Sequence, residues 1–248
     1  MKSRGYCYTC GRRTRFVTDY LYADPIHVHH GKKVPNWRER QVCSRCQLNS
    51  RVRSCIHFLE AQLGAESSDA IYVTEQLTPL YRKLRRSYGG LTGSEYLGSG
   101  LPFGETSDKT GVRNETLTDL SFRDESFRFI LSFDVFEHIP RYQAAFRECL
   151  RCLQPGGTLL FTVPFNMQTE EHVVRASIDD DGRVRHILPP EYHGDPVKTR
   201  GCLCFYHFGW ELLTELRQIG YSGTAAHLLW SDGLGYLGDN QILFTATR

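Results

Sequence analysis

The sequence has no apolar run long enough to cross a membrane, and it has almost no net charge. Its 248 residues carry 30 Lys and Arg against 28 Asp and Glu, which gives a formal net charge of +2 at pH 7. A balance this close to zero provides no overall field to attract nucleic acid or an anionic membrane. The first residues, MKSRGYCYTC, lack the apolar core of a signal peptide. We therefore expect a cytoplasmic protein with no membrane partner, and nucleic acid is a disfavoured partner.

Internal repeats and long low-complexity tracts are also absent, and the nine cysteines are an odd number. A chain of this length buries a full core without covalent cross-links, so it needs no disulfide framework. Its length is sufficient for one α/β domain plus a small module. The composition therefore favours reduced thiols and a metal site over disulfides.

Four of the cysteines form two C-x-x-C pairs, Cys7 with Cys10 and Cys43 with Cys46. Each pair can place two thiolates on one side of a tight turn, and two such turns make a tetrahedral site that suits zinc. A closed shell of four thiolates leaves no open coordination position, so the zinc would be structural. We predict a zinc-ribbon module over residues 1–47. The alternative is four reduced structural cysteines without a metal.

The segment between the two pairs contains three histidines, His27, His29 and His30. They are surplus to a set of four cysteines, so we expect a solvated loop. The alternative is that one of them replaces a cysteine or touches substrate.

The next segment, residues 48–69, has apolar side chains at helical spacing and a glycine stop at Gly64. We interpret it as a helix that links the ribbon to a second domain over residues 70–248.

The centre of that second domain is a strand, a helix and another strand in succession. Residues 127–133 are a nearly continuous apolar run, which is typical of a strand buried on both faces of a parallel sheet. We expect Pro140 to open the helix and residues 155–157 to end it, before a second buried strand over 158–163. This order makes the sheet parallel and places ligands at the carboxyl ends of its strands. Three polar residues follow the first of these strands: Asp134, Glu137 and His138.

The string LSFDVFEHIP followed by LRCLQPGGTLLFTVPF resembles the fourth-strand and fifth-strand signature of class I S-adenosylmethionine-dependent methyltransferases, in particular the type 11-like group. In that family a strand ending in Asp, with Glu-His after it, precedes a helix that ends in Leu-x-Pro-Gly-Gly. The resemblance is dense over residues 126–165 and loose elsewhere. It implies a Rossmann-like α/β domain with a mostly parallel sheet and an antiparallel C-terminal hairpin, which we expect over 227–230 and 241–245.

The resemblance also implies where the cofactor S-adenosylmethionine would bind. Glu95 ends the predicted second strand, where an acidic residue accepts hydrogen bonds from both ribose hydroxyls. A weak third strand is expected over 112–116, and one of its last two residues would read the adenine amino group. The candidate cofactor-binding residues are Glu75, Gln76, Thr78, Glu95, Tyr96, Glu115, Thr116, Phe133 and Asp134.

The loop after the first strand departs from the family. A Gly-rich G-x-G turn normally lets the backbone approach the cofactor there, but this chain has TEQLTP over residues 74–79. Side chains would then replace the backbone contacts, with Glu75 on the cofactor ammonium and Gln76 or Thr78 on its carboxylate. The alternative is an altered pocket that holds the cofactor poorly or holds something else.

Residues 166–207 form the most distinctive polar stretch, which includes RHILPPEYHGDP. An ordinary core gains nothing from so many polar side chains close together, so we predict a substrate-binding insertion; a solvated loop is the alternative. His193 is the first choice for a general base, because an imidazole suits proton removal near neutral pH. Glu191, Asp195, His186 and His207 are the next choices. His138 either contacts substrate or holds its own loop in place.

These features predict a methyltransferase that acts on a small-molecule or glycan-type acceptor in a bacterial biosynthetic pathway. A first alternative is a methyltransferase-like fold that cyclises, eliminates or binds without transferring methyl. A second alternative is an RNA or protein methyltransferase, in which the ribbon reads the substrate. Phosphate contacts would then come from the arginines Arg12, Arg13, Arg15, Arg51 and Arg53.

Overall fold

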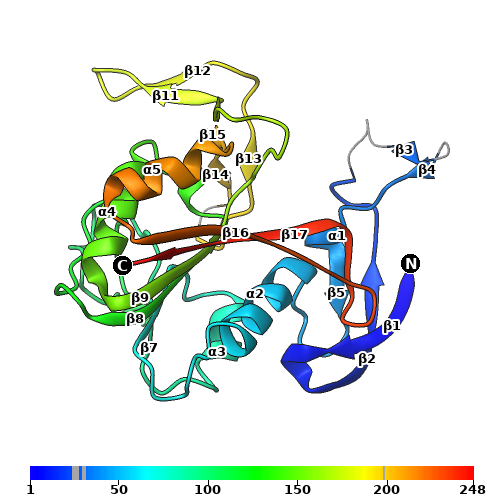
Figure 1. Cartoon of the computed structure of the whole chain (residues 1–248). Coiled ribbons are helices and arrows are strands. Elements are labelled where there is room, and N and C mark those ends of the chain that lie inside the picture. The colour runs from blue at the N-terminus through cyan, green and yellow to red at the C-terminus, as the bar shows by residue number, and fades with distance from the viewer. Residues whose placement is uncertain (24–27, 30–31, 198) are drawn as a thin grey trace. The chain divides into compact units, whose positions relative to one another are not determined.

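The computed structural model describes residues 1–23, 28–29, 32–197 and 199–248. The predictions for His27 and His30, and for the side chain of His29, lie outside the described residues. The chain divides into two compact units (Figure 1). Unit 1 comprises Met1–Glu66 and His227–Leu243, and unit 2 comprises Ser67–Ala226 and Phe244–Arg248. Residues 227–243, which we placed in the second domain, therefore group with the N-terminal residues.

Unit 1 contains a three-stranded antiparallel sheet in the order β1-β2-β5. Its elements are β1 (Lys2–Cys7), the 3-10 turn η1 (Tyr8–Cys10), β2 (Arg12–Thr18), β3 (Val28–His29), β4 (Lys32–Lys33), α1 (Trp37–Arg40), β5 (Gln41–Cys43) and α2 (Ser50–Ala61). The predicted linking helix is α2, and it is shorter than the segment 48–69. Asn49 caps its start by accepting the N–H of Val52 at 2.9 Å.

The side chain of Arg53 on α2 lies inside unit 1 and is fully buried. Its guanidinium donates to the carbonyl oxygens of Leu234 and Gly235, both at 2.8 Å. Arg51 donates to Glu39 at 2.7 Å. Both arginines therefore have partners within unit 1, and the full burial of Arg53 leaves it no surface for a phosphate contact.

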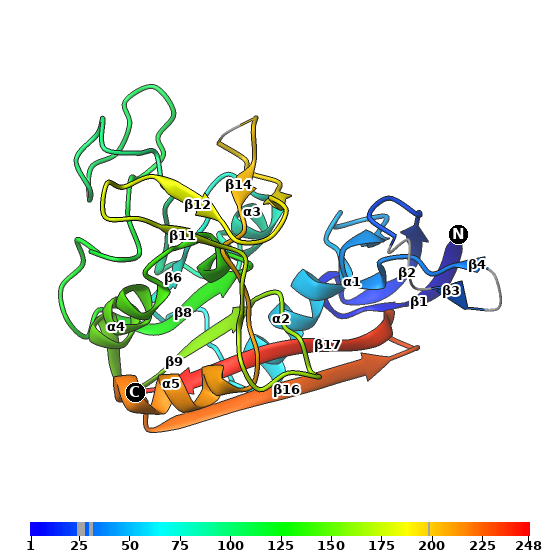
Figure 2. The same cartoon turned by 90° about the horizontal axis from the view of Figure 1, so that it is seen from above.

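Unit 2 is built on a mostly parallel sheet (Figures 1 and 2). The strand order is β16-β17-β9-β8-β6-β7. The strands are β6 (Ile71–Val73), β7 (Leu91–Gly93), β8 (Phe127–Phe133), β9 (Leu153–Thr162), β16 (Gly223–Ser231) and β17 (Tyr236–Thr247). Of the last two strands, only residues 223–226 and 244–247 belong to unit 2. β6, β7, β8 and β9 pair in parallel, and β17 pairs with β9 antiparallel through 244–247. This arrangement confirms the predicted Rossmann-like fold class.

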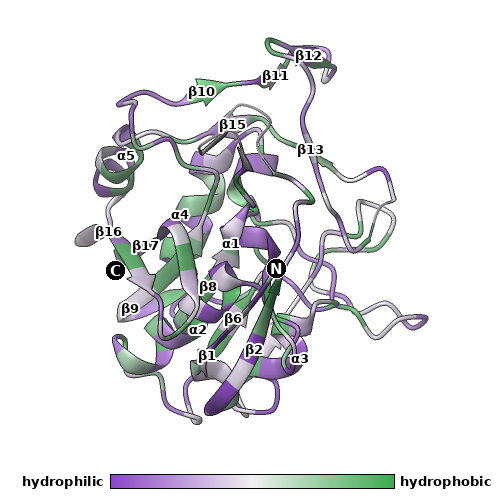
Figure 3. Cartoon of the chain, turned by 90° about the vertical axis from the view of Figure 1, so that its right-hand side faces the viewer, coloured by the Kyte–Doolittle hydropathy of each residue, from purple (hydrophilic) through white to green (hydrophobic). Residues whose placement is uncertain are grey.

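The middle strands of this sheet form its core. β8 has the predicted bounds, and six of its seven residues are buried. Figure 3 shows hydrophobic stretches in β6 and β8. The helices of unit 2 are α3 (Pro79–Leu84), α4 (Tyr142–Cys152) and α5 (Glu211–Ile219). No helix within the described ranges is long and apolar enough to cross a membrane.

Two local predictions in unit 2 are wrong. α4 begins at Tyr142 instead of Pro140, because a 3-10 turn η2 (Phe136–His138) comes first and the carbonyl of Pro140 accepts the Tyr206 hydroxyl at 2.8 Å. α4 also ends before 155–157, which lie within β9.

The predicted third strand over 112–116 does not form. A single parallel bridge joins Asn114 to Glu95. The Asn114 amide donates to the Gly98 and Leu101 carbonyls, and its oxygen accepts the N–H of Leu97 at 2.8 Å. The backbone bonds at this bridge run from Glu95 N to Arg113 O at 2.9 Å and from Glu115 N to Glu95 O at 3.1 Å, and the pairing is too short to count as a strand.

The insertion over 166–207 folds into three short antiparallel strand pairs, β10 with β15, β11 with β12, and β13 with β14. The strands are β10 (Val173–Val174), β11 (Ala176–Ile178), β12 (Val184–His186), β13 (Tyr192–His193), β14 (Cys202–Leu203) and β15 (Tyr206–His207). The pairing of β13 with β14 requires Gly201. Its φ is 74°, and a Cβ at this position would collide with the carbonyl oxygen of His193.

Candidate functional site

The acid predicted to bind the ribose anchors the loop that replaces G-x-G. Glu95 follows β7 and is only 8% exposed. Its Oε1 accepts the backbone N–H groups of Gln76 and Leu77, both at 2.8 Å. Within the described ranges, no hydrogen bond reaches its Oε2. Burial raises the pKa of Glu95, although the two N–H groups oppose the rise. One carboxylate oxygen thus holds the loop and the other is left for a ligand.

The polar side chains of this loop already have partners within the protein. Gln76 donates to the carbonyl of Gly111 at 3.0 Å and accepts the N–H of Arg113 at 2.9 Å. Thr78 caps α3 by accepting the N–H of Tyr81 at 3.2 Å. Glu75 is half-buried. For Gln76 and Thr78, binding the cofactor carboxylate would mean sharing or leaving these contacts.

The candidates for adenine recognition differ in their surroundings. Glu115 is buried, and its carboxylate accepts from Arg113 Nε at 2.8 Å, from Ser121 Oγ at 2.6 Å and from Ser121 N at 3.1 Å. Thr116 shares a hydrogen bond of 3.0 Å with the Thr118 hydroxyl. Tyr96 is 51% exposed. Glu115 therefore closes its own loop in this structure, whereas the Tyr96 ring is accessible to a ligand.

The end of β8 carries an unusual backbone conformation. Phe133 is buried and ends the strand, and Asp134 after it has a φ of 55°. A non-glycine residue in this left-handed region is uncommon and marks a local constraint. Thr162 supplies the constraint, because its carbonyl accepts the N–H of Asp134 at 2.9 Å and its hydroxyl donates to Oδ1 at 2.8 Å. The chain thereby turns sharply into Glu137 and His138.

Five side chains gather beyond this turn, and we call them the glutamate–histidine cluster: Glu137, His138, Glu191, His193 and His207. Oε1 of Glu137 lies 3.5 Å from Nε2 of His138 and 3.4 Å from Nδ1 of His193. Oε1 of Glu191 lies 2.9 Å from Nε2 of His193 and 3.0 Å from Nε2 of His207. His193 therefore bridges two carboxylates, one at the end of β8 and one in the insertion.

The charges in this cluster are strongly coupled. Burial raises the pKa of Glu137, which is fully enclosed. The contact with Glu137 raises the pKa of His193 to about 9, against the opposing effect of burial. Burial also works against ionisation of Glu191, but the hydrogen bonds from His193 and His207 leave its pKa lowered. At neutral pH His193 therefore keeps its proton, which does not suit the general base predicted from the sequence.

The structure brings together the three predicted catalytic residues His193, Glu191 and His138. His207, a lower choice for the base, also lies in the cluster. The prediction missed the cluster member Glu137 and the neighbouring Arg175. Glu137 was noted only for its position, although a carboxylate directly after a buried strand and beside a histidine was a usable signal. Arg175, whose guanidinium lies 3.1 Å from Glu191 Oε2, gave no sequence signal at all.

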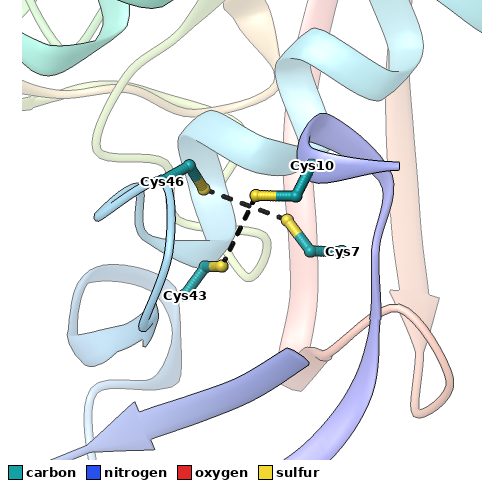
Figure 4. Close-up of side chains that lie close together, drawn as sticks. All are labelled: Cys7, Cys10, Cys43 and Cys46. Carbon is teal, nitrogen blue, oxygen red and sulfur yellow. Dashed lines mark hydrogen bonds between the residues drawn. The ribbon is translucent and has the colours of Figure 1, made fainter. Parts of the chain in front are cut away.

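In unit 1 the four predicted zinc ligands lie together, with all four sulfur atoms pointing toward one another (Figure 4). Sγ of Cys7 is 3.9 Å from that of Cys46, and Sγ of Cys10 is 3.9 Å from that of Cys43. These distances exclude disulfides. They match the spacing of about 3.8 Å expected between thiolates around a tetrahedral zinc at about 2.3 Å. The residues present therefore fit a four-thiolate zinc site.

The turns that carry these cysteines both end in a left-handed residue. Each C-x-x-C pair is followed by a residue with positive φ, Gly11 at 63° and Gln47 at 61°. The N–H of Gln47 bonds to the carbonyl of Cys43 at 3.0 Å, and the N–H of Gly11 bonds to that of Tyr8 at 2.9 Å. In the absence of a cation, contact with Cys43 raises the pKa of Cys7 to about 11. Thiols packed this closely do not ionise together unless a cation stabilises them.

Comparison with known proteins agrees with this architecture. Residues 80–161 match the family model of a methyltransferase domain. No curated protein sequence matches the chain. An S-adenosylmethionine-dependent methyltransferase from Mesorhizobium loti has a similar structure, with a TM-score of 0.50 and 15% identity over 82% of this chain and 100% of that chain.

Two further solved structures are similar at lower scores. One is the 1,6-didemethyltoxoflavin-N1-methyltransferase of Burkholderia thailandensis, with a TM-score of 0.44 and 14% identity over 80% of this chain and 78% of that chain. The other is the [4+2]-cyclase SpnF, with a TM-score of 0.41 and 17% identity over 71% of this chain and 60% of that chain. With the strand order above, the chain has the Rossmann-like fold of S-adenosylmethionine-dependent methyltransferases, and its residues 80–161 match the model of their domain.

Proposed function

We propose that this protein transfers a methyl group from S-adenosylmethionine to a small-molecule or glycan-type acceptor. We place it in the cytoplasm and in a bacterial biosynthetic pathway. The observation that carries the proposal is the pair of polar sites at the carboxyl ends of parallel strands of one sheet. Glu95 follows β7, and the glutamate–histidine cluster follows β8. Ligands of open α/β sheets bind at this edge.

In this proposal the cofactor supplies a sulfonium-activated methyl group, and the protein holds and orients it. Glu95 Oε2 accepts from the ribose hydroxyls while Oε1 keeps the 74–79 loop in place. Glu75 pairs with the ammonium group of the cofactor, because the loop has no glycine to let the backbone approach. The Tyr96 ring covers the adenine.

The acceptor would dock against His193, Glu191 and His138. Catalysis would come mainly from holding the acceptor atom in line with the methyl group, which replaces a bimolecular encounter by a fixed geometry. A hydroxyl acceptor must also lose its proton. With a pKa of about 9, His193 is unsuited to take that proton at neutral pH while it also contacts Glu137.

We further propose that the four cysteines of unit 1 bind one structural zinc ion. Cys7 and Cys43 are fully buried and form a small core cluster with Phe16. A closed set of four thiolates has no position for substrate, so this zinc would stabilise unit 1 without taking part in catalysis.

The test of methyl transfer is release of S-adenosylhomocysteine when the full chain is incubated with S-adenosylmethionine and a panel of nucleotide-linked sugars and small hydroxyl and amine acceptors. We expect turnover with one acceptor class and at least a tenfold loss of turnover in Glu95→Ala. Cofactor binding without turnover on any acceptor would instead favour the second candidate function.

The second candidate is a methyltransferase-like protein with non-methylating chemistry. The arrangement that favours it is the 74–79 loop, whose Gln76 and Leu77 N–H groups face Glu95 instead of a cofactor. S-adenosylmethionine or S-adenosylhomocysteine carried through purification would argue against a pocket that had lost the cofactor.

A further inference from the structure

The carboxylate of Glu137 is fully buried, with a relative exposure of 0%. Among the residues that the structure describes, neither of its oxygens has a hydrogen-bond partner. Two imidazole nitrogens lie nearby, at 3.4 Å and 3.5 Å from Oε1, but without hydrogen-bond geometry. Burying a carboxylate without a compensating partner costs several kcal/mol, so such a group normally faces a cation or a proton.

His138 presents a lone pair to this carboxylate. Its Nδ1 lies 2.8 Å from the carbonyl oxygen of Leu203. A carbonyl oxygen only accepts hydrogen bonds, so Nδ1 carries the hydrogen. In the neutral imidazole, Nε2 is then unprotonated and faces Glu137 Oε1. Nε2 of His138 and Oε1 of Glu137 are then two hydrogen-bond acceptors 3.5 Å apart, with no hydrogen between them.

His193 repeats the pattern with its ring reversed. Its Nε2 lies 2.9 Å from Oε1 of Glu191, and Glu191 is a carboxylate because Arg175 and His207 also pair with it. Nε2 therefore donates, and Nδ1 faces Glu137. Without a metal Nδ1 carries the second proton of the ring, and a cation that binds there displaces this proton. A histidine that binds a metal through one nitrogen usually donates from the other to a carboxylate or a backbone carbonyl. Both histidines have this outer bond.

The distances also fit. Ligand atoms about 2.0–2.1 Å from a tetrahedral cation lie about 3.3–3.4 Å apart. The two nitrogens are 3.5 Å and 3.4 Å from Oε1 of Glu137, and one ligand atom from each of the three residues falls within 4.8 Å of the others. We propose that Glu137, His138 and His193 bind a divalent transition-metal cation, distinct from the zinc of the four cysteines.

Two imidazoles and one carboxylate favour Zn²⁺, Fe²⁺ or Co²⁺ over the hard cations Mg²⁺ and Ca²⁺. Three protein ligands leave at least one coordination position open, which is the arrangement of catalytic metal sites. A consequence that rests on the proposed function follows. An acceptor hydroxyl bound at the open position would lose its proton to solvent at a lower pH, which removes the need for His193 as a base.

The test is a calorimetric and absorption titration of the full, zinc-loaded chain with Co²⁺. We expect one further Co²⁺ per chain, with d–d absorption but without the thiolate charge-transfer band that cobalt at the four cysteines would give. Glu137→Gln and His193→Gln should each weaken this binding at least about tenfold. His186→Gln, an exposed histidine of the same insertion, should leave it unchanged.

Two results would overturn the proposal: no saturable Co²⁺ or Zn²⁺ binding beyond the four-cysteine site, or binding that Glu137→Gln and His193→Gln leave unchanged. If Glu137→Gln does not fold, the half-exposed His193 still decides the question. This titration needs neither S-adenosylmethionine nor an acceptor. Cation binding can therefore be found without methyl transfer, and methyl transfer can be found without cation binding.

Discussion

The two metal sites that we propose, at the four cysteines and in the glutamate–histidine cluster, would be assembled in two different ways. In unit 1 the ligands come from two short motifs, and the cysteines themselves make up most of a small core cluster with Phe16. In unit 2 the ligands come from the end of β8 and from an insertion, more than 50 residues apart along the chain (137 to 193). That cluster lies beside a large sheet core that does not include it.

The difference predicts different roles for the two cations. Where the ligands form the core, removing the cation removes the core, so the zinc would be structural. Where the ligands lie at the edge of an independent core, the cation adds stability only by mass action and remains free for chemistry. The following predictions test this contrast.

The largest effect on stability is expected from Cys43→Ser. Loss of one thiolate should abolish zinc binding and leave unit 1 unfolded, because the binding free energy of a structural zinc, about 10–16 kcal/mol in small zinc modules, is folding free energy. Mass spectrometry measures the zinc content, and limited proteolysis shows whether residues 1–66 lose their protease resistance. Cys202→Ser, in unit 2, serves as the control and should keep the zinc. A folded, zinc-free Cys43→Ser unit 1 would show that the four cysteines are structural without a metal.

A smaller effect is expected when Co²⁺ is added to the zinc-loaded protein. Unit 2 should be folded without it and gain about 2.7 kcal/mol at 100 times Kd. Thermal unfolding monitored with and without Co²⁺ measures the gain, and Glu137→Gln should remove it. If unit 2 proved unfolded without the second cation, the two sites would not differ as we argue.

The smallest effect is expected from Gly201→Ala. The φ of 74° and the collision with the His193 carbonyl should destabilise the β13–β14 pair by about 1–3 kcal/mol and weaken Co²⁺ binding. Gly194→Ala is the matched control, since a Cβ there meets nothing within 4 Å. Denaturant unfolding and Co²⁺ titration of both variants give the comparison. If the two alanine variants had equal stability and equal Co²⁺ affinity, the conformation of Gly201 would not contribute to cation binding by the cluster.

The parts of the fold that were predictable from the sequence are those with local signals. The apolar run at 127–133 predicted β8 with its observed bounds, because burial on both faces favours a nearly continuous run of apolar residues. The two C-x-x-C pairs predicted four neighbouring cysteines for a similar reason, since a tight turn fixes the spacing within each pair.

The rest depended on contacts between distant residues. Residues 112–116 make only isolated bridges, to Glu95, Thr106 and Asp119, and the sequence pattern does not reveal how far such a pairing extends. The suitability of His193 as a base could not be judged either. Its pKa is set by Glu137, which only the fold brings within 3.4 Å. The two-residue strands of the insertion are likewise too short to leave a periodic pattern.

The most direct test of the central claim is a calorimetric titration of zinc-loaded protein with S-adenosylmethionine, carried out on wild type, Glu95→Gln and Glu95→Ala. We predict saturable one-to-one binding to wild type. Glu95→Gln should weaken it less than Glu95→Ala, because an amide oxygen still accepts one hydrogen bond. Glu95→Ala should weaken it at least tenfold, since it removes the ribose acceptor and releases the 74–79 loop. Equal affinity of all three proteins would contradict the ribose role of Glu95, and no binding to wild type would contradict the proposed methyl transfer.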